Sequence, residues 1–189
     1  MSRDLNLLQS NFREKVEAVL AECQHSGITM TPYYTIRTPH QQARLWRQSR
    51  TIAEIQEKIQ WLQANGAPYL ASVIEEVGPQ FGKKVTNAIP GLSWHQWGEA
   101  VDCFWNMDNR AEWSSRKKAI LPDGTRTNGY RMYADMSTKH GLNAGGFWSS
   151  FKDWPHIQFR NQRLSSFYTI QEIDRHMQES FVHTSPVGS

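Results

Sequence analysis

Histidine and aspartate, which bind metals and transfer protons, recur at short spacing in the middle of this sequence. His95 stands seven residues before Asp102, with Gly98 between them. A glycine in such a span lets the chain fold back, so that the two side chains can converge. Asp102 also lies within an apolar run, residues 100–104, where an unpaired carboxylate costs on the order of several kcal/mol to bury. A cation or a paired side chain is therefore expected beside Asp102.

A second group of the same kind follows later, where Asp153 precedes His156 by three residues. Two histidine nitrogens and one aspartate oxygen form a ligand set for Zn²⁺, and a catalytic zinc keeps three protein ligands and one open position. Asp153, tethered beside one ligand, could then serve as general base toward water. Glu99 is a rival base, although an exposed glutamate at a strand edge is the simpler interpretation. Spacing alone also allows a structural His95–Asp102 hydrogen bond, with Asp153 as a turn residue.

The elements that must position these residues are predicted from apolar periodicity and from capping signals. Capping boxes begin at Thr38 and Thr51, and Gly27, Gly66 and Gly141 end helical patterns. Helices are predicted over about 5–26, 39–50, 52–65, 68–77, 129–140 and 170–182. Strands are predicted over 28–36, 100–104 and 156–159, with one further short strand between 85 and 99, a polar surface excursion over 108–128 and a turn over 143–146. Helices at both ends of a strand-rich middle predict an α+β fold.

Composition excludes several classes of protein. The 189 residues are 39% hydrophobic and 21% charged, which is globular and not disordered. The net charge of +3 is spread along the chain, so a nucleic-acid partner is not expected. Cys23 and Cys103 read as two buried small hydrophobic residues. We expect no membrane insertion and no signal peptide, and therefore synthesis in the cytoplasm.

The two histidine groups belong to a longer ordered set of motifs. The set resembles the zinc D-alanyl-D-alanine carboxypeptidases and dipeptidases, above all their L-alanyl-D-glutamate peptidase branch, which includes many phage endolysins. The segments that carry the resemblance are Arg37–Trp46, Val85–Gly91, Ser93–Asp102, Gly141–Trp148 and Asp153–His156. Together they extend from about Gly27 to Phe159, which is most of the chain.

The resemblance implies a Hedgehog/D,D-peptidase-like α+β fold, in which a small antiparallel sheet carries one zinc ion and is flanked by helices. It implies His95, Asp102 and His156 as zinc ligands. It also implies Asp153 as the catalytic carboxylate and Arg37 as the group that faces the substrate carbonyl and its developing oxyanion. Gln42 and Ser93 match positions near the substrate.

The chain departs from the family pattern at two places. Gln41 replaces a usual glutamate, and a long helical segment, residues 51–78, lies between the arginine and the zinc motifs. We therefore expect a single catalytic domain over residues 1–183, with a helical insertion at about 51–78 and a loose tail at 184–189. The insertion could remodel the substrate groove.

The expected function is zinc-dependent hydrolysis of peptidoglycan stem peptides at the L-alanyl-D-glutamate bond. Two alternatives stay open: a D-alanyl-D-alanine carboxypeptidase or dipeptidase, and a non-catalytic binding module that keeps the fold and the zinc. Retention of both Asp153 and Arg37 argues against the module. We expect the protein to be a monomer that acts on the cell wall after release by a holin, by lysis or by a secretion device. An immunity protein is an expected partner if the chain is a secreted toxin.

Overall fold

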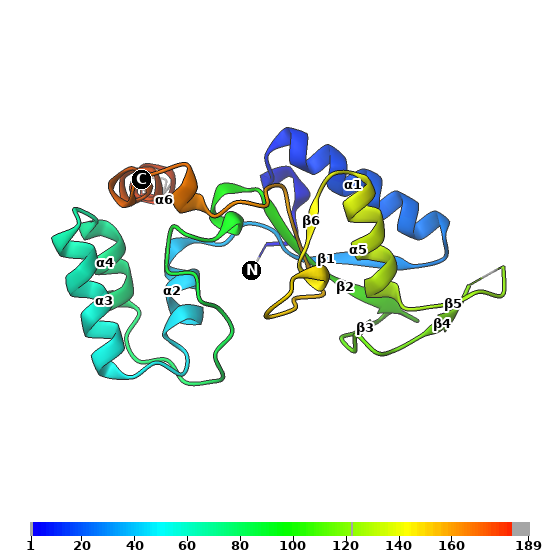
Figure 1. Ribbon diagram of the computed structural model, residues 1–189, viewed down its shortest axis with the longest axis horizontal. Helices are drawn as coiled ribbons and strands as arrows, with labels where there is room; N and C mark the ends of the chain where they lie inside the picture. The colour runs from blue at the N-terminus through cyan, green and yellow to red at the C-terminus, as the bar shows by residue number, and fades with distance from the viewer. Residues whose placement is uncertain (1, 122, 183–189) are drawn as a thin grey trace, which may run out of the picture. The chain divides into compact units, whose positions relative to one another are not determined.

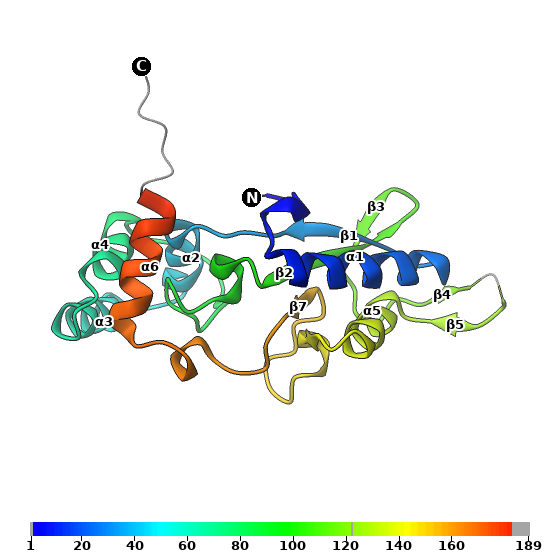
Figure 2. The ribbon, with the colours of Figure 1, turned by 90° about the horizontal axis from the view of Figure 1, so that it is seen from above.

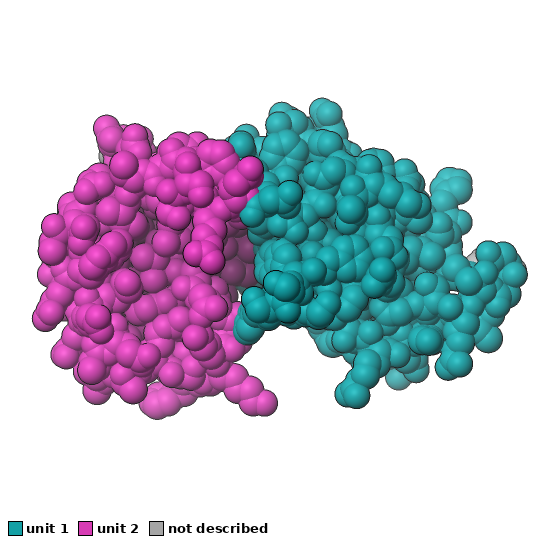
Figure 3. Space-filling view, in the orientation of Figure 1, with its two compact units in different colours: residues 1–36, 97–161 teal, residues 37–96, 162–189 magenta. Residues whose placement is uncertain are grey.

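The computed structural model describes residues 2–121 and 123–182, so the predicted tail at 184–189 lies outside the described residues. The chain divides into two compact units, Met1–Ile36 with Trp97–Asn161 and Arg37–Gln96 with Gln162–Ser189 (Figure 3). The first unit contains the sheet, and the second is helical. The predicted α+β class, with a small antiparallel sheet flanked by helices, is confirmed. Within the described ranges, no helix is long and apolar enough to cross a bilayer.

The first unit is built on an antiparallel sheet with the strand order β1-β2-β7-β6. A short strand, β3, pairs with the far end of β2, and a separate hairpin is formed by β4 and β5. The strands are β1 (Thr29–Tyr34), β2 (Ala100–Met107), β3 (Arg110–Glu112), β4 (Ala119–Ile120), β5 (Arg126–Thr127), β6 (Asn143–Ala144) and β7 (His156–Gln158). The helical segments of this unit are η1 (Leu5–Leu7), α1 (Ser10–His25), α5 (Gly129–Lys139) and η3 (Gly145–Phe147).

One face of this sheet is covered by α1 and α5, which lie side by side (Figure 1). The core between these layers contains Phe12 and Val16 from α1, Tyr133 from α5, and Val101 and Trp105 from β2. Because successive side chains of a strand point to opposite faces, Asp102 lies on the face of β2 away from this core. The apolar residues that predicted these helices recur about every 3.6 positions, and they are the residues that pack against the sheet.

The strand predicted between residues 85 and 99 is not observed, and the segment ends in a short helical turn, η2 (Trp94–Trp97). Side chains replace the strand ladder here as hydrogen-bond partners. The Gln96 side chain accepts the N–H of Gly91 (2.8 Å), and the Gln42 amide donates to the carbonyl of Ala88 (2.7 Å). Gly91 has a φ of 85°, which is incompatible with a strand.

Two other local predictions also need correction. The segment 143–146, expected to be a turn, forms the two-residue strand β6 and the start of η3. The segment 108–128, expected to be a polar surface excursion, contains β3 and the β4–β5 hairpin. These strands are only two or three residues long, so that no alternating pattern identifies them in the sequence.

The second unit is a group of helices: α2 (Pro39–Arg47), α3 (Ile52–Ala64), α4 (Pro68–Glu76), η4 (Leu164–Ser166) and α6 (Ile170–Val182). Both predicted capping boxes are present, Thr38 with Gln41 and Thr51 with Glu54. α4 packs against α2, α3 and α6, and α6 lies beside α4 in Figure 2. Ile52, the first residue of α3, is 74% exposed, whereas Ile55 and Leu62 of the same helix are buried.

Candidate metal centre

The core of the site is a cross-strand pair between β2 and β7. Asp102 and His156 are direct antiparallel partners, so their side chains share one face of the sheet. The Nδ1 atom of His156 lies 2.9 Å from Oδ1 of Asp102. The imidazole is buried and the carboxylate is partly buried. Strand pairing thus joins two residues that are 54 positions apart in the sequence.

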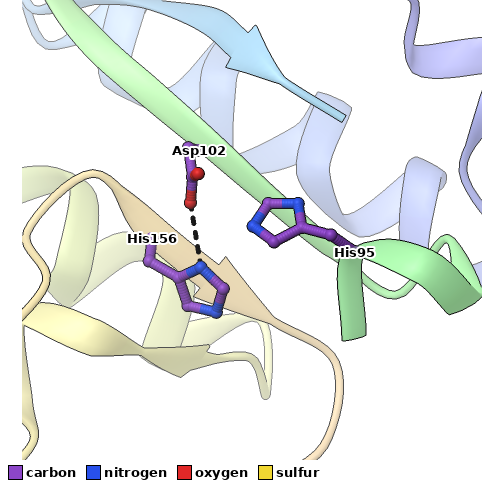
Figure 4. A group of neighbouring side chains, drawn as sticks. All are labelled: His95, Asp102 and His156. Carbon is purple, nitrogen blue, oxygen red and sulfur yellow. Dashed lines mark hydrogen bonds and ion pairs between the residues drawn. The ribbon is translucent and has the colours of Figure 1, made fainter. Parts of the chain in front are cut away.

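His95 completes the group from η2, and Figure 4 shows its ring directed toward Asp102 and His156. The possible ligand atoms of the three residues all lie within 4.8 Å of one another. Two imidazole nitrogens and one carboxylate oxygen are a donor set that suits Zn²⁺ and leaves room for a further ligand. The residues of this structure therefore fit a metal ion.

The surroundings of His156 determine which ring nitrogen can bind a metal. Its Nε2 atom lies 3.0 Å from the side-chain oxygen of Gln158, and the amide nitrogen of Gln158 donates to the carbonyl of Arg160 (2.5 Å). With Gln158 oriented in this way, Nε2–H donates to the Gln158 oxygen. The carboxylate of Asp102 only accepts, so Nδ1–H donates to it in the absence of a metal, and Nδ1 is the nitrogen that would lose its proton to bind one. Burial lowers the pKa of His156, but hydrogen bonding to Asp102 and the charges of Asp102 and Asp153 outweigh it and raise the pKa above its ordinary value.

Asp153 is held beside His156 by a turn that packs onto η3. Its N–H donates to the carbonyl of Gly145 (3.0 Å), and its own carbonyl accepts the N–H of His156 (3.2 Å). A Cβ atom on Gly145 would lie 2.5 Å from the carbonyl oxygen of Asp153, and one on Gly146 would lie 2.4 Å from the ring of Trp154. The two glycines are thus required for close packing, a role that their reading as a simple turn missed.

Aromatic packing also positions His156, because the ring centroid of Trp148 lies 5.2 Å from that of the imidazole. The indole N–H of Trp148 donates to the side chain of Asn143 in β6 (3.0 Å), which fixes the ring. In the sequence, Trp148 is only the last residue of the Gly141–Trp148 motif, and its contact with His156 is visible only in the structure.

Arg37 and Gln42 form a buried pair in the helical unit. The Nη1 atom of Arg37 donates to the side-chain oxygen of Gln42 (2.9 Å), and the amide nitrogen of Gln42 donates to the carbonyl of Ala88. The backbone N–H of Arg37 donates to the carbonyl of His95 (3.3 Å), so the arginine lies next to this candidate ligand. Ser93 is partly buried and directly precedes η2.

Glu99 and the cysteines have other partners. The carboxylate of Glu99 accepts two hydrogen bonds from the guanidinium of Arg160, at 2.6 and 3.1 Å. This bidentate pairing favours a structural role for Glu99. Cys23 and Cys103 are both buried, and burial raises the pKa of each thiol to about 12. The interpretation of the cysteines as small buried hydrophobic residues agrees with this.

Comparison with known proteins decides the family. The profile described as VanY, D-alanyl-D-alanine carboxypeptidase, matches residues 5–154. The chain belongs to this family. The matched range includes His95, Asp102 and Asp153 and ends two residues before His156. Among solved structures, this peptidase is similar to the L-Ala D-Glu endopeptidase ChiX of Serratia marcescens, with 15% identity and a TM-score of 0.44 over 82% of this chain and 83% of that one.

The family resemblance predicted from the motifs is therefore confirmed, and the chain is a peptidase. Family membership, together with the His/Asp/His group on a small antiparallel sheet, agrees with the D,D-peptidase-like fold expected from the sequence. In this peptidase, His95, Asp102 and His156 can hold a metal ion.

Proposed function

We propose that this peptidase is a zinc enzyme that hydrolyses the stem peptides of peptidoglycan at the L-alanyl-D-glutamate bond. The observation that carries the proposal is the convergence of His95, Asp102 and His156, with Asp153 beside His156, in a member of this family. The choice of bond rests on the motif resemblance to the L-alanyl-D-glutamate peptidases.

Zinc is the metal that the donor set favours, because histidine nitrogen and carboxylate oxygen in a three-ligand site are typical of catalytic zinc. When bound, zinc acts as a Lewis acid on the scissile carbonyl and increases the acidity of water. His156 would use Nδ1 as its ligand atom, since Nε2 faces Gln158. Each ligating histidine must be neutral, so the metal opposes the protonation that the two aspartates favour in its absence.

Asp153 is proposed as the general base and acid. Its carboxylate accepts a proton from the attacking water and then returns this proton to the leaving amine nitrogen. Its backbone is held by Gly145 and His156, so the carboxylate stays close to a ligand. Glu99, whose carboxylate is engaged by Arg160, is less suited to this exchange.

Arg37 is proposed to stabilise the negative charge that develops on the carbonyl oxygen of the substrate. A guanidinium remains charged at every relevant pH and offers donors in a rigid fork. Gln42 binds one arm of this fork and is itself buried. Gln42 and Ser93 were predicted near the substrate, and the contacts of Gln42 support a positioning role toward Arg37.

A D-alanyl-D-alanine carboxypeptidase is the second candidate, because the matching family carries this description. The deciding experiment incubates the metal-loaded protein with a disaccharide pentapeptide from cell walls and identifies the products by mass spectrometry. The proposed activity releases a disaccharide that retains one L-alanine. The second activity releases free D-alanine and leaves a tetrapeptide. Binding of the substrate without any product would indicate the non-catalytic module.

The cellular setting is proposed together with the activity. We propose that the chain acts as a monomer on peptidoglycan after release from the cytoplasm, and that an immunity protein accompanies it if it serves as a toxin. Sedimentation equilibrium of the metal-loaded protein tests the monomer, since a mass near twice 21.9 kDa would contradict it.

A further inference from the structure

An aromatic row, which consists of Tyr33, Phe104 and Trp113, lies on the sheet of the first unit. The ring centroids of Tyr33 and Trp113 are 5.1 Å apart, and those of Phe104 and Trp113 are 5.8 Å apart. Both distances are typical of aromatic pairs in direct contact. The three rings come from β1, from β2 and from the residue that follows β3, so the sheet itself sets their spacing.

The row lies on the same face of the sheet as the candidate metal centre. Phe104 follows Asp102 by two residues on β2, and side chains two apart in a strand point to one face. Extending the β2–β3 pairing by one residue sets Trp113 opposite Phe104. The register of β1 shifts between Pro32 and Tyr34, and such a bulge re-aims the extra side chain, here Tyr33.

These rings remain accessible although they are large and apolar. Trp113 is 51% exposed, and Tyr33 and Phe104 are partly exposed. α1 and α5 pack against the opposite face of the sheet. A contiguous exposed aromatic cluster costs solvation free energy and commonly marks a binding surface. The guanidinium of Arg3 lies over the ring of Phe104, 6.0 Å from its centroid, and adds hydrogen-bond donors at this end of the row.

We propose that the aromatic row binds a pyranose ring of the glycan strand to which the stem peptide is attached. This proposal rests on the proposed peptidoglycan peptidase function. A pyranose presents a flat face of C–H groups that stacks on aromatic rings, and its edge carries hydroxyl groups that accept hydrogen bonds from a guanidinium such as that of Arg3. A stem peptide alone, rich in carboxylates and amide groups, offers no comparable flat apolar face.

The position of the row agrees with cleavage close to the sugar. The Cα atoms of Asp102 and Phe104 are separated by about 7 Å, at roughly 3.3–3.4 Å per strand residue. In an L-alanyl-D-glutamate substrate, one alanine and a lactyl group separate the scissile bond from the ring. At about 3.3–3.6 Å per unit, this linkage spans ~7 Å, whereas four residues and the lactyl group intervene in a D-alanyl-D-alanine substrate. The row therefore favours the bond nearest the glycan.

The test compares kcat/KM for one stem peptide in two forms, linked to its disaccharide and free of it. We expect the unmodified protein to prefer the linked form. We expect Trp113→Ala to lower kcat/KM for the linked form by about tenfold more than for the free peptide, as lost stacking at a binding surface would do. The matched control is Trp61→Ala, which removes a 43% exposed tryptophan from α3 and should leave both values unchanged.

Equal losses on both substrates, or the same selective loss in Trp61→Ala, would overturn the glycan proposal. A direct binding measurement keeps it separate from the proposed activity. Calorimetric titration of the metal-loaded protein with an N-acetylglucosamine tetramer should give a Kd that weakens about tenfold in Trp113→Ala. If the stem peptide is cleaved in neither form, linked or free, the proposed function is wrong. The titration then still decides whether the aromatic row binds sugar. No change in Kd between the variants overturns the proposal.

Discussion

The Nε2 atom of His156 lies 3.0 Å from the side-chain oxygen of Gln158, which is two residues further along β7 and on the same face of the sheet. This contact holds the ring with Nδ1 toward Asp102 and makes Gln158 a positioning residue for a proposed ligand. Gln158 is buried and was not singled out in the sequence. The i, i+2 spacing of His156 and Gln158 in a predicted strand is the signal that could have identified it.

Gln158→Leu should weaken zinc binding by about 10-fold, because loss of the partner that orients a ligating histidine typically costs ~10–100-fold in metal affinity. Competition with a chromophoric chelator measures this affinity. Gln63→Leu, an exposed change on α3, is the control and should bind zinc like the unmodified protein. Unchanged affinity in Gln158→Leu would show that the hydrogen bond does not orient His156 for the metal.

His95→Ala should lose most of the one zinc expected per chain, because two protein ligands remain where catalytic zinc usually has three. Metal analysis after gel filtration gives the stoichiometry. His40→Ala is a suitable control, since His40 is partly exposed and pairs with Glu76. A full equivalent of zinc in His95→Ala would remove His95 from the proposed ligand set.

Asp153→Asn should keep zinc and fold but lower kcat by about 10²–10⁴-fold, as expected when a general base is lost. Asparagine preserves the size of the side chain and the backbone contacts with Gly145 and His156. Activity on a defined stem peptide is measured with zinc content checked in the same sample. Near-normal activity would reassign the role, and Glu99→Gln would then be the next variant to examine.

Arg37→Lys should lower kcat by about 10²–10³-fold, which is the usual cost of losing one oxyanion donor. Lysine retains the charge but loses the fork that Gln42 orients. Values of kcat and KM for Arg37→Lys and Arg37→Ala, with zinc loading verified, separate a role in the reaction from a role in substrate binding. If Arg37→Lys keeps kcat within about threefold of the unmodified value, the oxyanion role is wrong.

Gly145→Ala should destabilise the protein by about 1–3 kcal/mol, since the new methyl group would overlap the backbone of Asp153 and force it to move. The same shift should weaken zinc binding through His156. Thermal unfolding and chelator competition provide the two measurements. Gly78→Ala is the control for zinc binding: no atom lies within 4 Å of its added Cβ, so left-handed strain at a φ of 63° should lower its stability by roughly 1–2 kcal/mol without changing its zinc affinity. An unfolding midpoint and a zinc affinity equal to those of the unmodified protein would contradict the close-packing role of Gly145.

Local signals in the sequence determined the helices and the identities of the candidate ligands. Thr38 and Thr51 begin their helices through side-chain hydrogen bonds to residues three positions on, and these interactions need no distant partner. A metal centre was predicted from the spacing of His95, Asp102, Asp153 and His156 and from the family resemblance. The structure brings three of these residues together, His95, Asp102 and His156.

Only the tertiary structure decided the features that depend on strand pairing over long sequence distances. The pairing of β2 with β7 sets Asp102 opposite His156 and brings Arg160 to Glu99, 61 positions apart. The same sheet gathers Tyr33, Phe104 and Trp113 into one row. Register and bulges arise from the summed packing of whole strands against α1 and α5, so no local window of the sequence contains them.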